Sequence, residues 1–147
     1  MTLNKTLPML LVLCGLFSPV AYAQALIEVE NAWLREAPPV SRVNAAYMTL
    51  HNRSNKDVTL ESVASRFYDH AMIHRTVTEN GISRMLHQGD ITIPAKGKIT
   101  LQPDGLHMML MRPVSPLRQG DEIFVKLNFT KQPSMFIKVP VLKTAPK

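Results

Sequence analysis

Histidine and methionine side chains are concentrated in one part of this chain. Eight of them fall within 40 residues: Met72, His74, Met85, His87, His107, Met108, Met109 and Met111. Thioethers are soft ligands that favour copper(I), and imidazole binds copper as well. Zinc would favour Cys, His and carboxylate ligands, and acidic residues are sparse in this segment. The cluster therefore predicts a site for copper(I) or silver(I).

The spacing of the last four members predicts which of them share a face. If residues 106–111 form a β-strand, side chains two apart point the same way. His107 and Met109 then lie on one face, with Met111 beside them, while Met108 lies on the other face. Methionine in a β-sandwich usually fills the core, and we assign Met108 to the core on this ground.

A turn between two further segments predicts how the other ligands meet. Asn80-Gly81 accepts positive φ at both central positions, which is typical of a two-residue hairpin turn. That turn places His74 opposite His87 and makes His74 and Met85 a diagonal pair, with Cα atoms on the order of 7–8 Å apart. One hairpin and one further strand can thus present four side chains to a single ion. These four are His74, Met85, His107 and Met109.

Other members of the cluster keep two or more interpretations. His87 is a fifth ligand, a neighbour that orients a ligand, or a bystander. His70 and Met72 point to the same strand face as His74, so they can border the site. Met111 is either core or an auxiliary ligand, since it lies nearer the strand end.

The elements that must position these residues are short strands. Alternating segments are broken by Pro, Gly, Asn and Asp, a pattern that indicates an antiparallel sandwich or barrel. Pro116–Gln119 alone suggests a helical turn. The expected strands are 26–35, 45–51, 58–63, 71–78, 82–87, 91–93, 98–102, 106–111, 123–130 and 135–142.

The first residues predict a secretory signal peptide. Lys5 precedes an apolar run over 7–20, and Ala21-Tyr22-Ala23 is a small-x-small cleavage site. We expect cleavage after Ala23, a single domain over 24–147, and no membrane span after cleavage. Cys14 offers a lipoprotein alternative, which we weigh lower because Leu13, not a small residue, precedes it.

Cleavage would remove the only cysteine of the chain. The exported domain would then have no disulfide and no thiolate, which excludes a blue-copper centre and a cysteine nucleophile. No Ser/His/Asp or paired-carboxylate pattern indicates an enzyme. The net charge of +6 comes from scattered basic residues and predicts a solvated surface rather than nucleic-acid binding.

The spacing His74-x10-Met85-x21-His107-x-Met109 resembles the signature of the periplasmic copper chaperones called PCuAC. The resemblance extends over nearly all of residues 24–147. It implies a cupredoxin-like antiparallel β-sandwich, a monomer, that binds one copper(I) per chain through these four residues. It further implies delivery of copper for the copper-A site of cytochrome c oxidase, directly or through a partner thiol protein.

The sequence departs from the family pattern beside two of the ligands. Ile73 and Leu86 stand where relatives often have an acidic residue and an arginine. These changes leave the ligands intact and bear on partner recognition. The alternative function is an exported β-sandwich that acts in interaction, copper storage or tolerance without a role in oxidase assembly.

Overall fold

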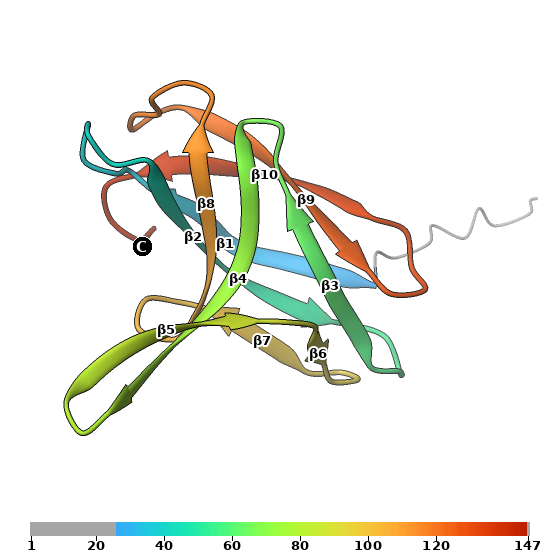
Figure 1. Ribbon diagram of the computed structural model, residues 1–147. Helices are drawn as coiled ribbons and strands as arrows, with labels where there is room; N and C mark the ends of the chain where they lie inside the picture. Colours follow the sequence, from blue (N-terminus) through green and yellow to red (C-terminus); the bar gives the residue numbers. More distant parts are fainter. Residues whose placement is uncertain (1–25, 147) are drawn as a thin grey trace, which may run out of the picture.

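The computed structural model describes residues 26–146, and every regular element in that range is a β-strand (Figure 1). The predicted signal peptide over 1–23, with Cys14, lies outside the described residues. Among residues 26–146 no helix is long and apolar enough to span a bilayer. The strands are β1 Ile27–Arg35, β2 Val43–Asn52, β3 Val58–Ala64, β4 Tyr68–Glu79, β5 Ile82–Gln88, β6 Ile91–Ile93, β7 Lys98–Leu101, β8 Leu106–Pro113, β9 Glu122–Phe129 and β10 Met135–Leu142.

The predicted all-β sandwich is confirmed. One layer has the strand order β5-β4-β8-β2-β1, with β7 also paired to β2, and the other has the order β10-β9-β3-β6. All pairs within the layers are antiparallel. A short parallel pair, Leu34 with Val141 and Arg35 with Leu142, joins β1 to β10 and closes one side. This parallel pair is the one feature that the antiparallel prediction lacked.

Apolar side chains from both layers meet in a single core. Strands alternate buried and exposed positions, so that one face of each layer is apolar. Burying each large aliphatic side chain contributes about 1.5–3 kcal/mol, and this term dominates the stability of a domain without disulfides. The largest fully buried side chains are Leu34, Met48, Leu50, Leu60, Ile93, Leu101, Met108, Leu110, Ile123, Leu127, Val58 and Val125.

One buried polar side chain connects the two layers. Asn52 at the end of β2 is fully buried, and its Nδ2 donates to the carbonyl oxygens of Lys56 (2.8 Å) and Ile93 (3.0 Å) on β6. Its Oδ1 accepts from the backbone N and the Oγ of Ser54. All hydrogen-bonding atoms of this amide are therefore used, as burial requires.

The β4–β5 hairpin has the predicted turn and register. Asn80 (φ 52°) and Gly81 (φ 77°) both have positive φ, and His74 lies opposite His87. The hairpin extends away from the rest of the fold at the lower left of Figure 1. Almost every side chain of β5 is exposed, because no second layer covers this edge strand. The hairpin is therefore an arm attached to the sandwich at its base.

The helical turn suggested for Pro116–Gln119 is wrong. The segment between β8 and β9 is a loop that ends in a turn at Gln119-Gly120. The carboxylate of Asp121 accepts a hydrogen bond from the backbone N of Arg118 (2.8 Å), and the Asp121 N donates to the Arg118 carbonyl (3.0 Å). This Asp-stabilised turn pairs the backbone N and carbonyl of Arg118 within the segment where the helical turn was expected.

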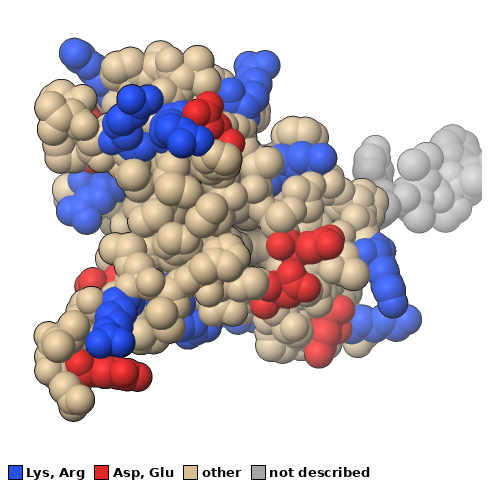
Figure 2. Space-filling view, in the orientation of Figure 1, with Lys and Arg blue, Asp and Glu red and all other residues tan. Residues whose placement is uncertain are grey.

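Charged side chains are interspersed on the face shown in Figure 2. Lys and Arg lie near Asp and Glu at its edges, and no large area of one sign is present. The centre of this face, over β4 and β8, is occupied by uncharged side chains. The scattered charge predicted from the sequence therefore holds for this face, and its uncharged centre lies over two of the strands with predicted ligands, β4 and β8.

Candidate metal site

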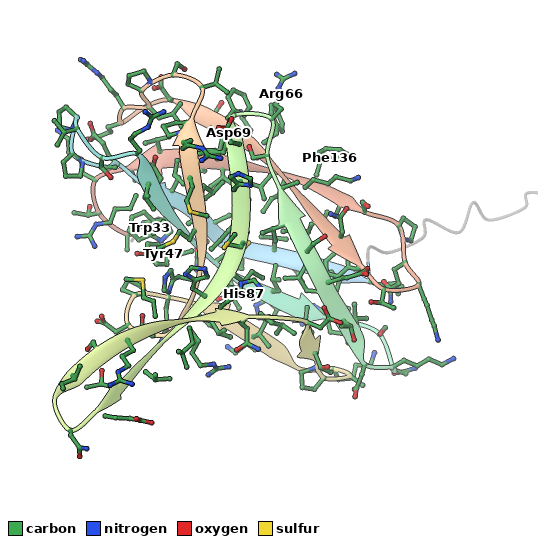
Figure 3. All side chains as sticks on the ribbon, in the orientation of Figure 1. Trp33, Tyr47, Arg66, Asp69, His87 and Phe136 are labelled. Atoms are coloured by element: carbon green, nitrogen blue, oxygen red, sulfur yellow. The ribbon has the colours of Figure 1, made fainter. Side chains whose placement is uncertain are left out.

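Three histidines form a row across the outer face of the first layer. His74 on β4 is the register partner of both His107 on β8 and His87 on β5. The ring centroids of His74 and His107 are 6.1 Å apart, and those of His74 and His87 are 5.9 Å apart. His74 is the central ring of the row, and Figure 3 labels His87 at the base of the hairpin.

The two predicted thioether ligands lie on opposite sides of this row. Met109 is opposite Met72, one step along the strands from the His74–His107 pair. Met85 is opposite Thr76, one step in the other direction, and its side chain is 60% exposed. The sheet thus brings His74, His107 and Met109 side by side. Met85 is diagonal to His74, as predicted, and extends from the arm into solvent.

The ring of His107 is held in one tautomer. Its Nδ1 lies 3.0 Å from the carbonyl oxygen of Gly105, which can only accept, so Nδ1 carries the proton. Nε2 then has its lone pair available for a metal ion. The same carbonyl accepts the backbone N–H of Thr76 (3.0 Å), which ties the turn before β8 to β4. His107 is only 6% exposed and is therefore oriented before any ion arrives.

The ring of His74 has a buried nitrogen without a partner. Its Nδ1 makes no hydrogen bond to the described residues, which is rare for a buried polar atom. Desolvation by burial, followed by the nearby rings of His107 and His87, lowers the pKa of His74 below 6.5. A lowered pKa favours the neutral imidazole, which is the form that binds metal.

The composition of the site selects the kind of ion. Among residues 26–146, no three side chains of His, Cys, Asp and Glu lie close enough together to hold a metal ion. Next to the His74–His107 pair, the further side-chain donors are the thioether of Met109 and, from the hairpin, that of Met85. Thioether and imidazole without carboxylate fit copper(I), as the residue types predicted.

Sequence reasoning missed an aromatic pair next to His107. The register of β2 with β8 pairs Ala46 with Met108, so Tyr47 follows on the outer face beside His107. Tyr47 contacts Trp33 on β1 at a centroid distance of 4.9 Å, and both rings are buried (Figure 3). Strand parity puts Tyr47 on the same face as Ala45, but the sequence does not show that β2 pairs with β8, which is what brings Tyr47 next to His107.

The remaining members of the cluster separate into two groups. Met108 is fully buried in the core, as predicted from its parity. Met111 is half-buried on the outer face opposite His70, so it borders the site instead of filling the core. Met72 is half-buried next to Met109, and His70 is exposed. These outer-face residues adjoin the site at its Met109 side.

Comparison with known proteins places this geometry in a family. The family model described as "Putative lipoprotein LpqE-like" matches residues 27–141. The protein named "Putative lipoprotein Lxx21020" from Leifsonia xyli subsp. xyli is 31% identical over 116 residues, which cover 78% of this chain and 69% of that protein.

Solved structures agree with this assignment. The solution structure of copper(I)-loaded DR1885 from Deinococcus radiodurans is 34% identical, with a TM-score of 0.66 over 84% of this chain and 82% of that chain. The apo PCuAC domain from PmoF1 is 25% identical, with a TM-score of 0.69 over 85% of this chain and 98% of that domain. The resemblance to PCuAC proteins predicted from the four-residue spacing is confirmed, and the chain belongs to the LpqE-like family.

Proposed function

We propose that this protein is an exported copper(I) carrier that binds one ion per chain through His74, Met85, His107 and Met109. The observation that supports it most strongly is the His74–His107 pair, with centroids 6.1 Å apart and Met109 alongside. The His107 Nε2 is free to bind and the pKa of His74 is lowered. DR1885, which is similar over most of this chain, has been solved with copper(I) bound.

The arrangement suits a carrier better than an enzyme. The two imidazoles are fixed by the sheet, whereas the Met85 side chain is exposed on the arm. A thiolate or imidazole of an acceptor can replace Met85 first and the fixed ligands afterwards, so that the ion is never released to water. Copper(II) is disfavoured by two thioethers, which keeps the carried ion in the reduced state.

The cellular role that we propose, delivery of copper outside the cytoplasm, rests on the predicted signal peptide and on the proposed copper site. The segment over 1–23 has the anatomy of a cleavable signal, and delivery in the periplasm for the copper-A site of cytochrome c oxidase is the proposed use. The relatives are described as lipoproteins, which keeps a lipid-anchored form through Cys14 as the alternative location. Copper storage or tolerance is the alternative role.

A copper(I) titration against a competing chelator tests the binding site. We expect one ion per chain, and a loss of affinity of at least tenfold in either Met85→Leu or Met109→Leu. Met135→Leu is the matched control, because Met135 is a half-buried methionine on β10, in the other layer. Stoichiometry well below one ion, or wild-type affinity in the double variant Met85→Leu/Met109→Leu, would refute the carrier.

Deletion of the gene tests the role. If the protein supplies the copper-A site, the deletion strain loses cytochrome c oxidase activity under copper limitation, and added copper restores it. If the role is storage or tolerance, the oxidase is unaffected and the strain is instead more sensitive to copper. A strain carrying Met85→Leu/Met109→Leu should behave as the deletion does in either case.

A further inference from the structure

His87 is the member of the histidine row that the proposed copper(I) set does not use. It lies directly opposite His74 on β5, at a centroid distance of 5.9 Å, and its side chain is exposed. The His74–His107 distance is almost the same, at 6.1 Å. His74 therefore has an imidazole neighbour at a similar distance on each side, one buried and one open to solvent.

These distances are compatible with a shared ion in both pairs. An imidazole nitrogen binds a metal ion at about 2.0–2.1 Å, so two rings on one ion have centroids about 5–6 Å apart. The His74–His87 pair fits this range with a small adjustment of the exposed ring. Because the three rings form a row, an ion between His74 and His87 lies away from His107. The two positions are therefore distinct and have His74 in common.

The chemistry of the outer pair differs from that of the inner one. Its donors are two imidazoles, and its open side leaves the remaining coordination positions to water. Among divalent first-row ions, nitrogen and oxygen donors bind copper(II) most tightly. We infer that His74 and His87 form an outer subsite for copper(II), separate from the copper(I) position but sharing His74 with it. This inference rests on the proposed function for the identity of the inner site.

The hairpin side chains around the outer pair do not repel a cation. Arg75 and Arg84 on the hairpin have the opposite strand parity, so they point to the other face. Arg75 is further held there by a hydrogen bond from its Nε to Gln88 Oε1 (3.2 Å). The hairpin residues that share a face with the outer pair are uncharged: Thr76, Thr78, Ser83 and Met85. Within the described hairpin, no cationic side chain shares that face with a copper(II) ion.

Sharing of His74 has a measurable consequence. The two positions cannot both be filled, because a neutral imidazole has one unprotonated nitrogen and therefore binds one ion at a time. Protein loaded with one equivalent of copper(I) should therefore lose most of its copper(II) binding. Independent sites would instead take both ions.

Copper(II) titration of the apo protein, followed by electron paramagnetic resonance and by competition with glycine, tests the subsite. We expect one copper(II) per chain with two imidazole nitrogens. His87→Leu should lower copper(II) affinity at least tenfold and change copper(I) affinity less than threefold. Met85→Leu should do the reverse. His70→Leu, an exposed histidine on the same face of β4, is the matched control and should change neither.

The outcomes separate the two proposals. Unchanged copper(II) affinity in His87→Leu, or simultaneous binding of both ions, overturns the outer subsite and leaves the copper(I) site intact. Failure of the wild-type protein to bind copper(I), with a copper(II) signal that still depends on His87, overturns the carrier and not the outer pair.

Discussion

At the scale of single residues, the site depends on nitrogen atoms fixed in advance. The Gly105 carbonyl assigns the proton of His107 to Nδ1, and burial keeps the ring in place. The ring of His74 is held between two others, with a buried Nδ1 that has no partner among the described residues. An ion that binds here meets donors that need little reorganisation, which raises affinity without additional contacts.

The first prediction concerns His107. Replacement by leucine keeps the volume of a buried side chain, and the Gly105 carbonyl retains its bond from the Thr76 N–H. We therefore expect His107→Leu to lower copper(I) affinity at least about 100-fold, or about 2.7 kcal/mol. The free energy of unfolding should change by less than about 1.5 kcal/mol. Chelator competition and urea unfolding measure the two quantities, and a large loss of stability would show that the residue is structural.

The second prediction concerns pH and His74. Its pKa in the folded protein is lowered below the unfolded value of 6.5, so the unfolded state binds this proton more readily. The apo protein should therefore lose stability as the pH falls below about 6.5, and the loss should level off below the folded pKa. Urea midpoints between pH 7.5 and pH 4.5 measure this slope. His74→Gln should reduce this dependence of stability on pH. If the dependence is unchanged in the variant, another titratable group causes it.

At the scale of elements, the β4–β5 arm is the part that carries Met85 of the proposed copper(I) site. Its turn uses positive φ at both central residues, and Gly81 (φ 77°) is the one that a side chain would strain. The arm has no core of its own, since Ile82, Met85 and Leu86 are each at least half exposed. The turn and the β4–β5 ladder therefore determine how well Met85 is placed.

The third prediction tests the arm through its turn. Gly81→Ala should cost the hairpin about 1–2 kcal/mol and lower copper(I) affinity about threefold to tenfold, while the melting temperature of the sandwich changes little. Gly89→Ala is the matched control, because Gly89 has no positive φ and an added Cβ there meets open space. Equal copper(I) affinity in the two variants would mean that Met85 does not depend on the arm.

The turn and the strand parity, which are local signals in the sequence, predicted the β4–β5 arm correctly. The features that they missed depend on pairing between strands that are far apart in the chain. The Asn80-Gly81 turn sets the register of β4 and β5, and parity separates Met108 from its neighbours. The pairing of β4 with β8 joins residues 33 apart in the chain, His74 and His107, and no turn encodes it. The same is true of Tyr47 beside His107 and of the parallel β1–β10 pair. Parity and the hairpin register suggested the four proposed ligands, and the spacing typical of a family added the non-local information that one sequence lacks.

At the scale of the whole molecule, two β-layers without a cysteine in residues 24–147 must hold the site rigid. Apolar burial supplies most of the stability, and the hydrogen bonds of Asn52 connect the layers. The core packs on the opposite face of the first layer from the histidine row, and Asn52 lies at the end of β2, beyond the part that pairs with β8. Stability and copper binding should therefore respond to different substitutions.

The fourth prediction tests this separation at Asn52. Asn52→Ala removes the hydrogen-bond partner of the Ile93 carbonyl and of the Ser54 N–H, at a cost of about 3 kcal/mol, whereas the Ser54 hydroxyl still donates to the Lys56 carbonyl. Copper(I) stoichiometry at 25 °C should stay at one ion. Asn128→Ala is the control, because that amide is less buried and bonds only to serine side chains, Ser62 and Ser134. Urea unfolding with and without copper(I) provides both readouts.

The exposed arm has one more consequence, for how retention of the ion can change. In the proposed carrier, the affinity for copper(I) is lowered by the conformational entropy that the hairpin would lose on placing Met85 against the ion. Stiffening the hairpin anywhere along its length would lower that loss and slow departure of the metal, whereas loosening it would speed delivery. Solvent-facing positions such as Thr78 and Ser83, whose hydroxyls are hydrogen-bonded to each other at 2.9 Å, could thus tune the residence time of the ion without any change in its ligands.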